Sequence, residues 1–448
     1  MNSPDLPPPF PHLPPVAQAP RKGMGAGMIV LIILGVLVLF AGVLAALAIP
    51  VYKRMQGLAQ GAKDSLQHKA PAPPAKELTA LQKLELKAFG ERLADALTAG
   101  DAETIKSMLD SEGMADRVFD ERTSGFPQVS EMRKGFISGA TKPPGGWLRN
   151  VMGNKTKALH YRERDGYPAI VMRLTPEGGG VNYVDIVVRP FGKSFRAVDM
   201  FTYMYASYFT DETRNLMATM LPSSSVGKLA SLMGATNFDS EMINLLKKGG
   251  ELIKAGRYAE ALSICEALPE KYRTHRMFFM LRMQALMQLN DAEEGKYDAP
   301  YREMLRSAPD ILGADSTTDL LMIDLMFLDN QLAEADACIQ RVEKVVGGDP
   351  YLKVLRANTH RMMKDYEGAL KLATEAQSEE PDLFEAVDAR LTIHVEQKHY
   401  PAIVEEFREL KKKGVIMTRQ LLIEDGVYED FLASPEFAAW EKESGAQR

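Results

Sequence analysis

Gly256-Arg-Tyr-Ala-Glu-Ala261 opens a series of five similar segments that continues with Gly295-Lys-Tyr-Asp-Ala-Pro300, Asn330-Gln-Leu-Ala-Glu-Ala335, Lys364-Asp-Tyr-Glu-Gly-Ala369 and Lys398-His-Tyr-Pro-Ala-Ile403. We call these segments hexads. The third residue of the hexad, a tyrosine or leucine, advances in steps of 39, 35, 34 and 34 residues. A period near 34 is typical of stacked helix–turn–helix units, each of which buries its apolar face against its neighbours. The hexads therefore predict an α-helical solenoid of about five repeats over residues 222–448, closed by C-terminal capping helices.

The fourth unit shows how a hexad relates to its two helices. Ala357 falls in the predicted first helix, Lys364 and Asp365 make the turn, and Tyr366 begins the second helix. That helix carries small residues at Ala369, Ala373 and Ala376, which let paired helices approach closely, before a proline ends it.

The period and the hexads resemble the tetratricopeptide repeat (TPR) family over about residues 240 to 415. This resemblance implies a concave groove, lined by the first helix of each pair, that binds a protein or peptide partner. By alignment of the fourth and fifth units, Asn358, Arg361 and Thr392 are expected to face this groove. One TPR subgroup binds acidic carboxyl termini through paired lysines and asparagines. Val354 stands where such a lysine belongs, so that specificity is not expected here.

Residues 77–221 have the pattern of a separate α+β domain. An amphipathic helix is predicted over residues 81–97, with Gly100-Asp101 capping a second helix, and the apolar positions of the first are Leu81, Leu84, Leu86, Phe89, Leu93 and Leu97. Four strands are predicted after these helices, at residues 158–163, 167–174, 181–188 and 195–203. Helices followed by sequential strands predict an antiparallel sheet with helices on one face. In element order this domain is similar to nuclear transport factor two-like or cystatin-like cones.

Five titratable residues of this domain are the candidates for catalysis: His160, Glu163, Asp165, Asp185 and Asp199. If they share a pocket, the domain is a small-ligand-binding or hydrolase/isomerase-like module, which is the alternative function. The structural interpretation is simpler, because Asp165 is needed for a turn and Glu163 lies among other charges. No phosphate-binding loop, Gly-x-Ser-x-Gly, Cys-x-x-Cys or His-Glu-x-x-His occurs in the sequence. We therefore expect no enzyme, no cofactor and no metal.

An apolar segment lies near the amino terminus. Residues 23–52 contain no charged side chain, and residues 28–49 are all apolar or glycine. At about 1.5 Å per residue, these 22 residues span roughly 33 Å, enough for the hydrocarbon core of a bilayer. The segment predicts a single-pass membrane protein, anchored in lipid through residues 28–49, with its folded part on the outer, periplasmic or extracytoplasmic side. A cleaved signal peptide is the alternative, since Arg21 and Lys22 precede the apolar run.

The end of this segment, Ala45-Ala-Leu-Ala-Ile-Pro-Val-Tyr52, is similar to the amino-terminal helices of type IV pilin-like proteins. The similarity implies a structural or assembly component as a further alternative. The fifth residue after Gly23 is Met28, where those prepilins carry a glutamate.

The remaining features complete the predicted organisation. Residues 1–22 form a proline-rich tail expected to be disordered, residues 23–52 the membrane helix, and residues 53–76 a spacer. The formal charge is −6 and the basic residues are scattered, so no nucleic-acid partner is expected. Cys265 and Cys338 are expected to be buried apolar residues. Together these patterns predict a membrane-tethered protein–protein interaction scaffold.

Overall fold

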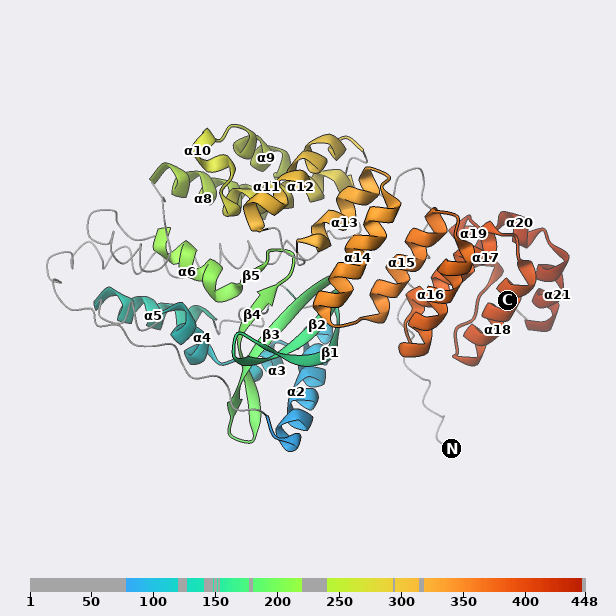
Figure 1. Cartoon of the computed structure of the whole chain (residues 1–448), viewed down its shortest axis with the longest axis horizontal. Coiled ribbons are helices and arrows are strands. Elements are labelled where there is room, and N and C mark those ends of the chain that lie inside the picture. The colour runs from blue at the N-terminus through green and yellow to red at the C-terminus, as the bar shows by residue number, and fades with distance from the viewer. Residues whose placement is uncertain are drawn as a thin grey trace, which may run out of the picture. The chain divides into compact units, whose positions relative to one another are not determined.

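The computed structural model describes residues 78–119, 127–140, 148, 151, 154–176, 180–219, 240–292, 295–313 and 318–444. This part of the chain is mostly helical, with one antiparallel sheet of five strands. It divides into two compact units (Figure 1): the sheet-bearing unit, which ends at Leu328, and the C-terminal helical unit, which begins at Asp329.

The sheet is a simple meander in which each strand pairs with the next, in the order β1-β2-β3-β4-β5. Its strands are β1 Lys155–Arg164, β2 Tyr167–Thr175, β3 Asn182–Phe191, β4 Ser194–Thr202 and β5 Ser207–Tyr208. Asp165 and Gly166 join β1 to β2 with φ of 51° and 79°, the left-handed conformations that a tight two-residue hairpin requires. The four predicted strands are thus confirmed, and the two-residue β5 was not predicted.

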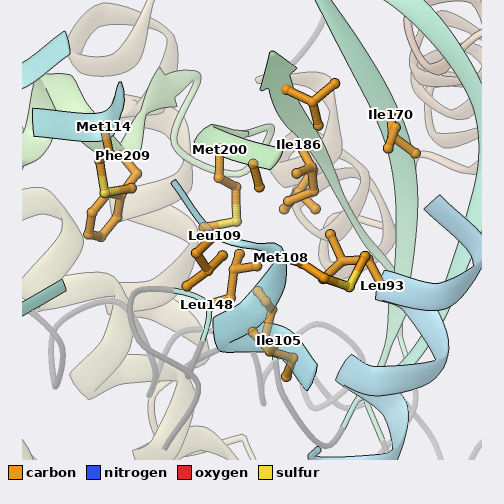
Figure 2. Close-up of a cluster of buried hydrophobic side chains, with 14 of the residues drawn as sticks. Leu93, Ile105, Met108, Leu109, Met114, Leu148, Ile170, Ile186, Met200 and Phe209 are labelled. Atoms are coloured by element: carbon orange, nitrogen blue, oxygen red, sulfur yellow. The ribbon is translucent and has the colours of Figure 1, made fainter. Parts of the chain in front are cut away.

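One face of the sheet is covered by α2 Ala80–Ala99, α3 Ala102–Met108, α4 Ser111–Val118 and α6 Phe209–Thr219; α5 Pro127–Ala140 packs on α4. Asp101, at the predicted cap, accepts a hydrogen bond from the Thr104 amide and starts α3. Figure 2 shows the apolar side chains of these helices gathered with those of β2, β3 and β4, among them Leu93, Ile105, Ile186 and Met200. Burial of such side chains is the main term that stabilises this layer.

The predicted apolar stripe of α2 is only partly correct. Leu86, Phe89, Leu93 and Leu97 are buried against the sheet, but Leu81 and Leu84 are 77% and 66% exposed. They lie in the first turns of α2, where the helix presents them to solvent and not to the sheet.

The described residues of the sheet-bearing unit also include the helices α8 Ser240–Lys254, α9 Tyr258–Glu266, α10 Glu270–Arg273, α11 Arg276–Ala292, α12 Asp298–Leu312 and α13 Asp319–Leu328. They pack mainly on neighbours in the chain, and the first helices α8 and α11 also contact each other. Met204 and Tyr205, just after β4, join the apolar core of these helices. Arg276 of α11 also forms an ion pair with the buried Glu212 of α6, at 3.1 Å, so helices and sheet share one folded unit.

The C-terminal helical unit repeats the same arrangement with α14 Leu332–Val346, α15 Pro350–Met362, α16 Tyr366–Glu379, α17 Phe384–Glu396, α18 Tyr400–Lys412, α19 Arg419–Asp425, α20 Glu429–Leu432 and α21 Pro435–Ser444. Each long helix packs on the next, and first helices α15 and α17 touch each other, as expected of a solenoid. An aromatic cluster that includes Phe407, Phe431 and Trp440 closes the carboxyl-terminal end of the stack.

The hexads mark the turns of these helix pairs. Their first residues, Gly256, Gly295, Asn330, Lys364 and Lys398, all have positive φ, between 53° and 77°. Around Lys364 the amide of Asp365 donates to the carbonyl of His360, and the amide of Lys364 to that of Arg361, both at 2.9 Å. This is the Schellman pattern that ends a helix with one left-handed residue. The sequence pattern therefore located real helix ends.

The second helices begin where the hexads predicted, at Tyr258, Leu332, Tyr366 and Tyr400, in four of the five units. The second unit is shifted by one residue: Tyr297 precedes α12, which begins at Asp298, and Tyr301 takes the fully buried position that Pro300 does not reach. Ala261, Ala335, Ala369 and Ile403 are fully buried at the corresponding position of the other units.

The structure corrects the expected localisation. Within the described residues no helix is both long enough and apolar enough to cross a membrane, so the prediction of a single-pass membrane protein does not stand. The predicted span at residues 28–49 lies outside the described residues, as do the tail at 1–22 and the spacer at 53–76.

Candidate functional site

Two fully buried carboxylates lie on β3 and β4, at positions next to core residues such as Ile186 and Met200. On β3, Asp185 is buried beside Arg162 and Arg164 of β1. Its Oδ2 accepts hydrogen bonds from both guanidinium groups, and its Oδ1 accepts one from the Tyr203 hydroxyl at 3.0 Å. Arg164 also stacks over the ring of Phe201, 3.6 Å from its centroid.

Asp199 of β4 is enclosed in the same way, by residues of two helices. Arg117 Nε of α4 donates to its Oδ2 at 2.7 Å, and the hydroxyl and amide of Thr210, in α6, donate at 2.6 and 3.1 Å. Burial raises the pKa of Asp199, and the Arg117 charge and the donated hydrogen bonds oppose that rise. The Arg117 guanidinium also lies over the rings of Tyr167 and Tyr208.

The other three titratable candidates of this domain lie on β1 or in the hairpin that follows it. Asp165 is in the β1–β2 hairpin and accepts a hydrogen bond from the Tyr208 hydroxyl. Glu163 is exposed on β1, and His160 is half-buried on the same strand. All four oxygens of Asp185 and Asp199 accept hydrogen bonds from protein groups. This arrangement favours a role in holding the strands to one another and to α4 and α6.

The predicted binding residues lie on the first helices of the C-terminal helical unit. Asn358 on α15 and Thr392 on α17 are half-buried. Arg361 is buried and forms an ion pair with Glu396 of α17, which also accepts a hydrogen bond from the Tyr366 hydroxyl at 3.1 Å. The guanidinium of Arg361 therefore joins two successive first helices, a contact that sequence reasoning missed because Glu396 lies 35 residues away.

Three carboxylates that the sequence analysis did not single out lie on α17 and α19; we call Glu385, Asp388 and Asp425 the acidic cluster. Glu385 and Asp388 are one turn apart on α17, and Asp425 ends α19. Burial raises the pKa of Asp388 to about 7, reinforced by the charges of Asp425 and Glu385 and opposed by Arg361. Burial also raises the pKa of Asp425 to about 6. Glu385, Asp388 and Thr392 are spaced by three and then four residues, which places them on one side of a helix. This spacing is the sequence pattern from which their proximity could have been predicted.

Among the described residues, no group of three His, Cys, Asp or Glu side chains is arranged so that it could hold a metal ion. The three carboxylates of the acidic cluster therefore do not form such a group. His360 and His394 lie 34 residues apart, on the first helices α15 and α17. His360 Nδ1 lies 2.7 Å from Asp365 Oδ2, and His394 is buried beside His399. Cys265 and Cys338 are buried, as predicted.

No protein-family model matches this chain, and no curated protein matches it either.

Proposed function

We propose that this chain is a protein–protein interaction scaffold of the TPR type, which binds a partner polypeptide along the face that α15 and α17 share. The observation that carries the proposal is the repeated turn. All five hexads start at a left-handed residue, and four of them start the second helix at the same position. Chance similarity of unrelated helical hairpins does not account for one conformation recurring in phase with the sequence period.

The face in question combines polar side chains with a rigid frame. Asn358 and Thr392 supply the partner contacts, while Arg361, held by Glu396, positions α15 against α17. Stacked helix pairs present such a face as an extended surface suited to a peptide or a helix. The first helices are held by two further ion pairs, Arg356–Asp336 and Arg390–Glu406, so the surface is formed before a partner arrives.

The alternative of a ligand-binding or hydrolytic α+β domain has less support. Its two buried carboxylates have their oxygens occupied by arginine, tyrosine, threonine and backbone donors. A general base needs an open lone pair within hydrogen-bond reach of its substrate.

The test is photo-crosslinking in intact cells from single positions of the full chain. A photoreactive amino acid replaces Asn358 or Thr392, and in the control it replaces Lys371, which is exposed on the second helix α16. We expect the same partner to crosslink from positions 358 and 392 and not from 371. Equal crosslinking from all three positions, or none from 358 and 392, would reject the proposed face.

A further inference from the structure

We infer that the acidic cluster receives a lysine or arginine side chain of the partner polypeptide. This inference rests on the proposed function and specifies the chemistry of the partner. It concerns Asp388 and Asp425, with Glu385 adding a third negative charge beside them.

The carboxylates of the cluster come from two helices of the C-terminal helical unit. Asp388 comes from α17 and Asp425 from the end of α19, and the charges of Asp425 and Glu385 both act on Asp388. Tyr428, which is 1% exposed, lies against the same carboxylates: burial raises its pKa, and the charges of Asp388 and Asp425 raise it further. Thr392, one turn after Asp388 on α17, connects the cluster to the proposed binding face.

The oxygens of the two aspartates are buried without a hydrogen-bond donor. Asp388 Oδ1 and both carboxylate oxygens of Asp425 have no partner within the described part of the chain. An ionised carboxylate left in this state costs several kcal/mol by general estimates, and buried polar groups of native proteins are nearly always paired. The site is thus built for a donor that this unit does not itself supply.

Three other partly buried acids of the unit each pair with an arginine. Glu406 receives Arg390 at 2.7 Å, Asp336 receives Arg356 at 2.8 Å, and Glu396 receives Arg361. The charge of Arg361 also acts on Asp388, but its effect on the pKa is smaller than those of burial and the neighbouring carboxylates, and Arg361 is already paired with Glu396. Asp388 Oδ1 and the carboxylate of Asp425 therefore differ from these three acids, because within the described residues no arginine donates to them.

Charge complementarity selects the occupant. Residues 329–448 contain 24 Asp and Glu against 16 Lys and Arg, a net formal charge of −8, whereas the whole chain carries −6. An acidic unit attracts basic polypeptides over distance, and a buried pair of carboxylates then favours an ammonium or guanidinium group that donates several hydrogen bonds. A lysine or arginine side chain is also long and flexible enough to place its charged end away from the peptide backbone.

Protonation supplies an independent readout. The groups facing Asp388 are Glu385 on its own helix, Asp425 and Tyr428 from the cap, and Arg361 from α15. A bound cation favours the ionised carboxylates, so affinity for a basic peptide should increase as pH rises from about 5.5 to about 8, through the raised pKa values of Asp425 and Asp388.

The experiment selects random displayed dodecapeptides on the immobilised full chain. Three forms are compared: wild type, the variant Asp388→Asn/Asp425→Asn, and the control Glu367→Gln/Asp382→Asn, which makes the same charge change at two exposed positions of the same unit. Selected peptides are then synthesised with each Lys or Arg replaced in turn by norleucine or citrulline. Because the native aspartates are unfavourable when ionised, the Asn substitutions should leave the fold intact, which circular dichroism checks.

We expect wild type and control to select peptides enriched in Lys or Arg, with one basic residue whose replacement lowers affinity about tenfold or more. The Asp388→Asn/Asp425→Asn variant should bind the unmodified peptide with the same loss of affinity, about tenfold or more. Replacing the basic residue of the peptide should lower the affinity of this variant no further, and its affinity should not increase with pH. Peptides selected without basic enrichment, but dependent on Asn358 and Thr392, would overturn this inference and leave the proposed function standing. An equal loss in the control variant would also overturn it. If no peptide is selected by any form, the inference and the proposed face both fail.

Discussion

Arg390 of α17 donates its Nε and Nη2 hydrogens to the two carboxylate oxygens of Glu406 on α18, at 2.7 and 2.8 Å. The two side chains are 10% and 15% exposed, so this bidentate pair joins the helices of the fifth repeat largely out of water. Removal of one partner should therefore cost more than removal of both.

The first prediction concerns this pair. Glu406→Gln leaves the Arg390 charge without its counter-charge, and we expect a loss of about 2–4 kcal/mol in unfolding free energy. The double variant Arg390→Met/Glu406→Leu should recover most of that loss, because it buries neither charge. Hydrogen exchange of the α17 and α18 amides measures the local stability. A double variant no more stable than Glu406→Gln would show that the ion pair is not the cause.

The second prediction concerns pH. Asp324 of α13 accepts a hydrogen bond from the Tyr301 hydroxyl of α12 at 3.0 Å, and burial raises its pKa from 3.8 to about 7. The folded chain thus holds this proton more tightly than the unfolded chain does. Stability from this group is fully present below about pH 4 and is lost as pH rises through about 7, in total on the order of a few kcal/mol.

Asp324→Asn should remove this dependence and raise the urea midpoint at pH 8 more than at pH 4. The exposed Asp310 of α12 provides the control, since Asp310→Asn should leave the pH profile unchanged. Identical profiles for wild type and Asp324→Asn would mean that the carboxyl is not held protonated.

The third prediction concerns helix packing. Ala369 is fully buried in α16, which packs closely on α15. Ala369→Leu should overpack this contact and cost roughly 1–3 kcal/mol, because the neighbouring backbones leave little room for a larger side chain. Lys371→Leu adds a similar apolar group at an exposed position of the same helix and should change stability little. Comparing the thermal unfolding of the two variants distinguishes the effect of overpacking at position 369 from the effect of adding an apolar side chain to the helix.

The fourth prediction concerns the left-handed turn residues. Gly256 has φ of 72°, and a Cβ added there would meet no atom within 4 Å, so Gly256→Ala tests backbone strain alone. We expect a loss of about 1 kcal/mol. Gly250, inside α8 and equally open, is the matched control, and Gly250→Ala should stabilise the helix by about 0.5–1 kcal/mol. Equal effects of the two substitutions on the urea midpoint would contradict the turn geometry.

Features that depend on a few adjacent residues could be predicted from the sequence. The hairpin at Asp165-Gly166, the cap at Asp101 and the helix ends at the hexads each follow from local φ and ψ preferences. The hexads predicted the turns correctly even at Lys364 and Lys398, which stand where other hexads have glycine. At these two positions the period identified the turn, because the residue type did not.

The candidate site could be predicted only in part. Asn358 and Thr392 follow from repeat alignment, but the ion pair that occupies Arg361 joins residues 35 positions apart, and the acidic cluster joins α17 to α19. The amphipathic pattern of α2 likewise did not reveal that Leu81 and Leu84 remain exposed.

The sequence by itself determined the turns of the hexads and the β1–β2 hairpin, because those conformations are local and the hexads recur with a nearly fixed period. Only the tertiary structure decided which charges are neutralised: Asp185 and Asp199 meet arginines from other elements, whereas the oxygens of Asp388 and Asp425 are buried without a donor in the described part of the chain. The physical reason is that burial and pairing depend on which distant segments pack together. The residues next to a carboxylate in the sequence do not reveal which side chains it will contact.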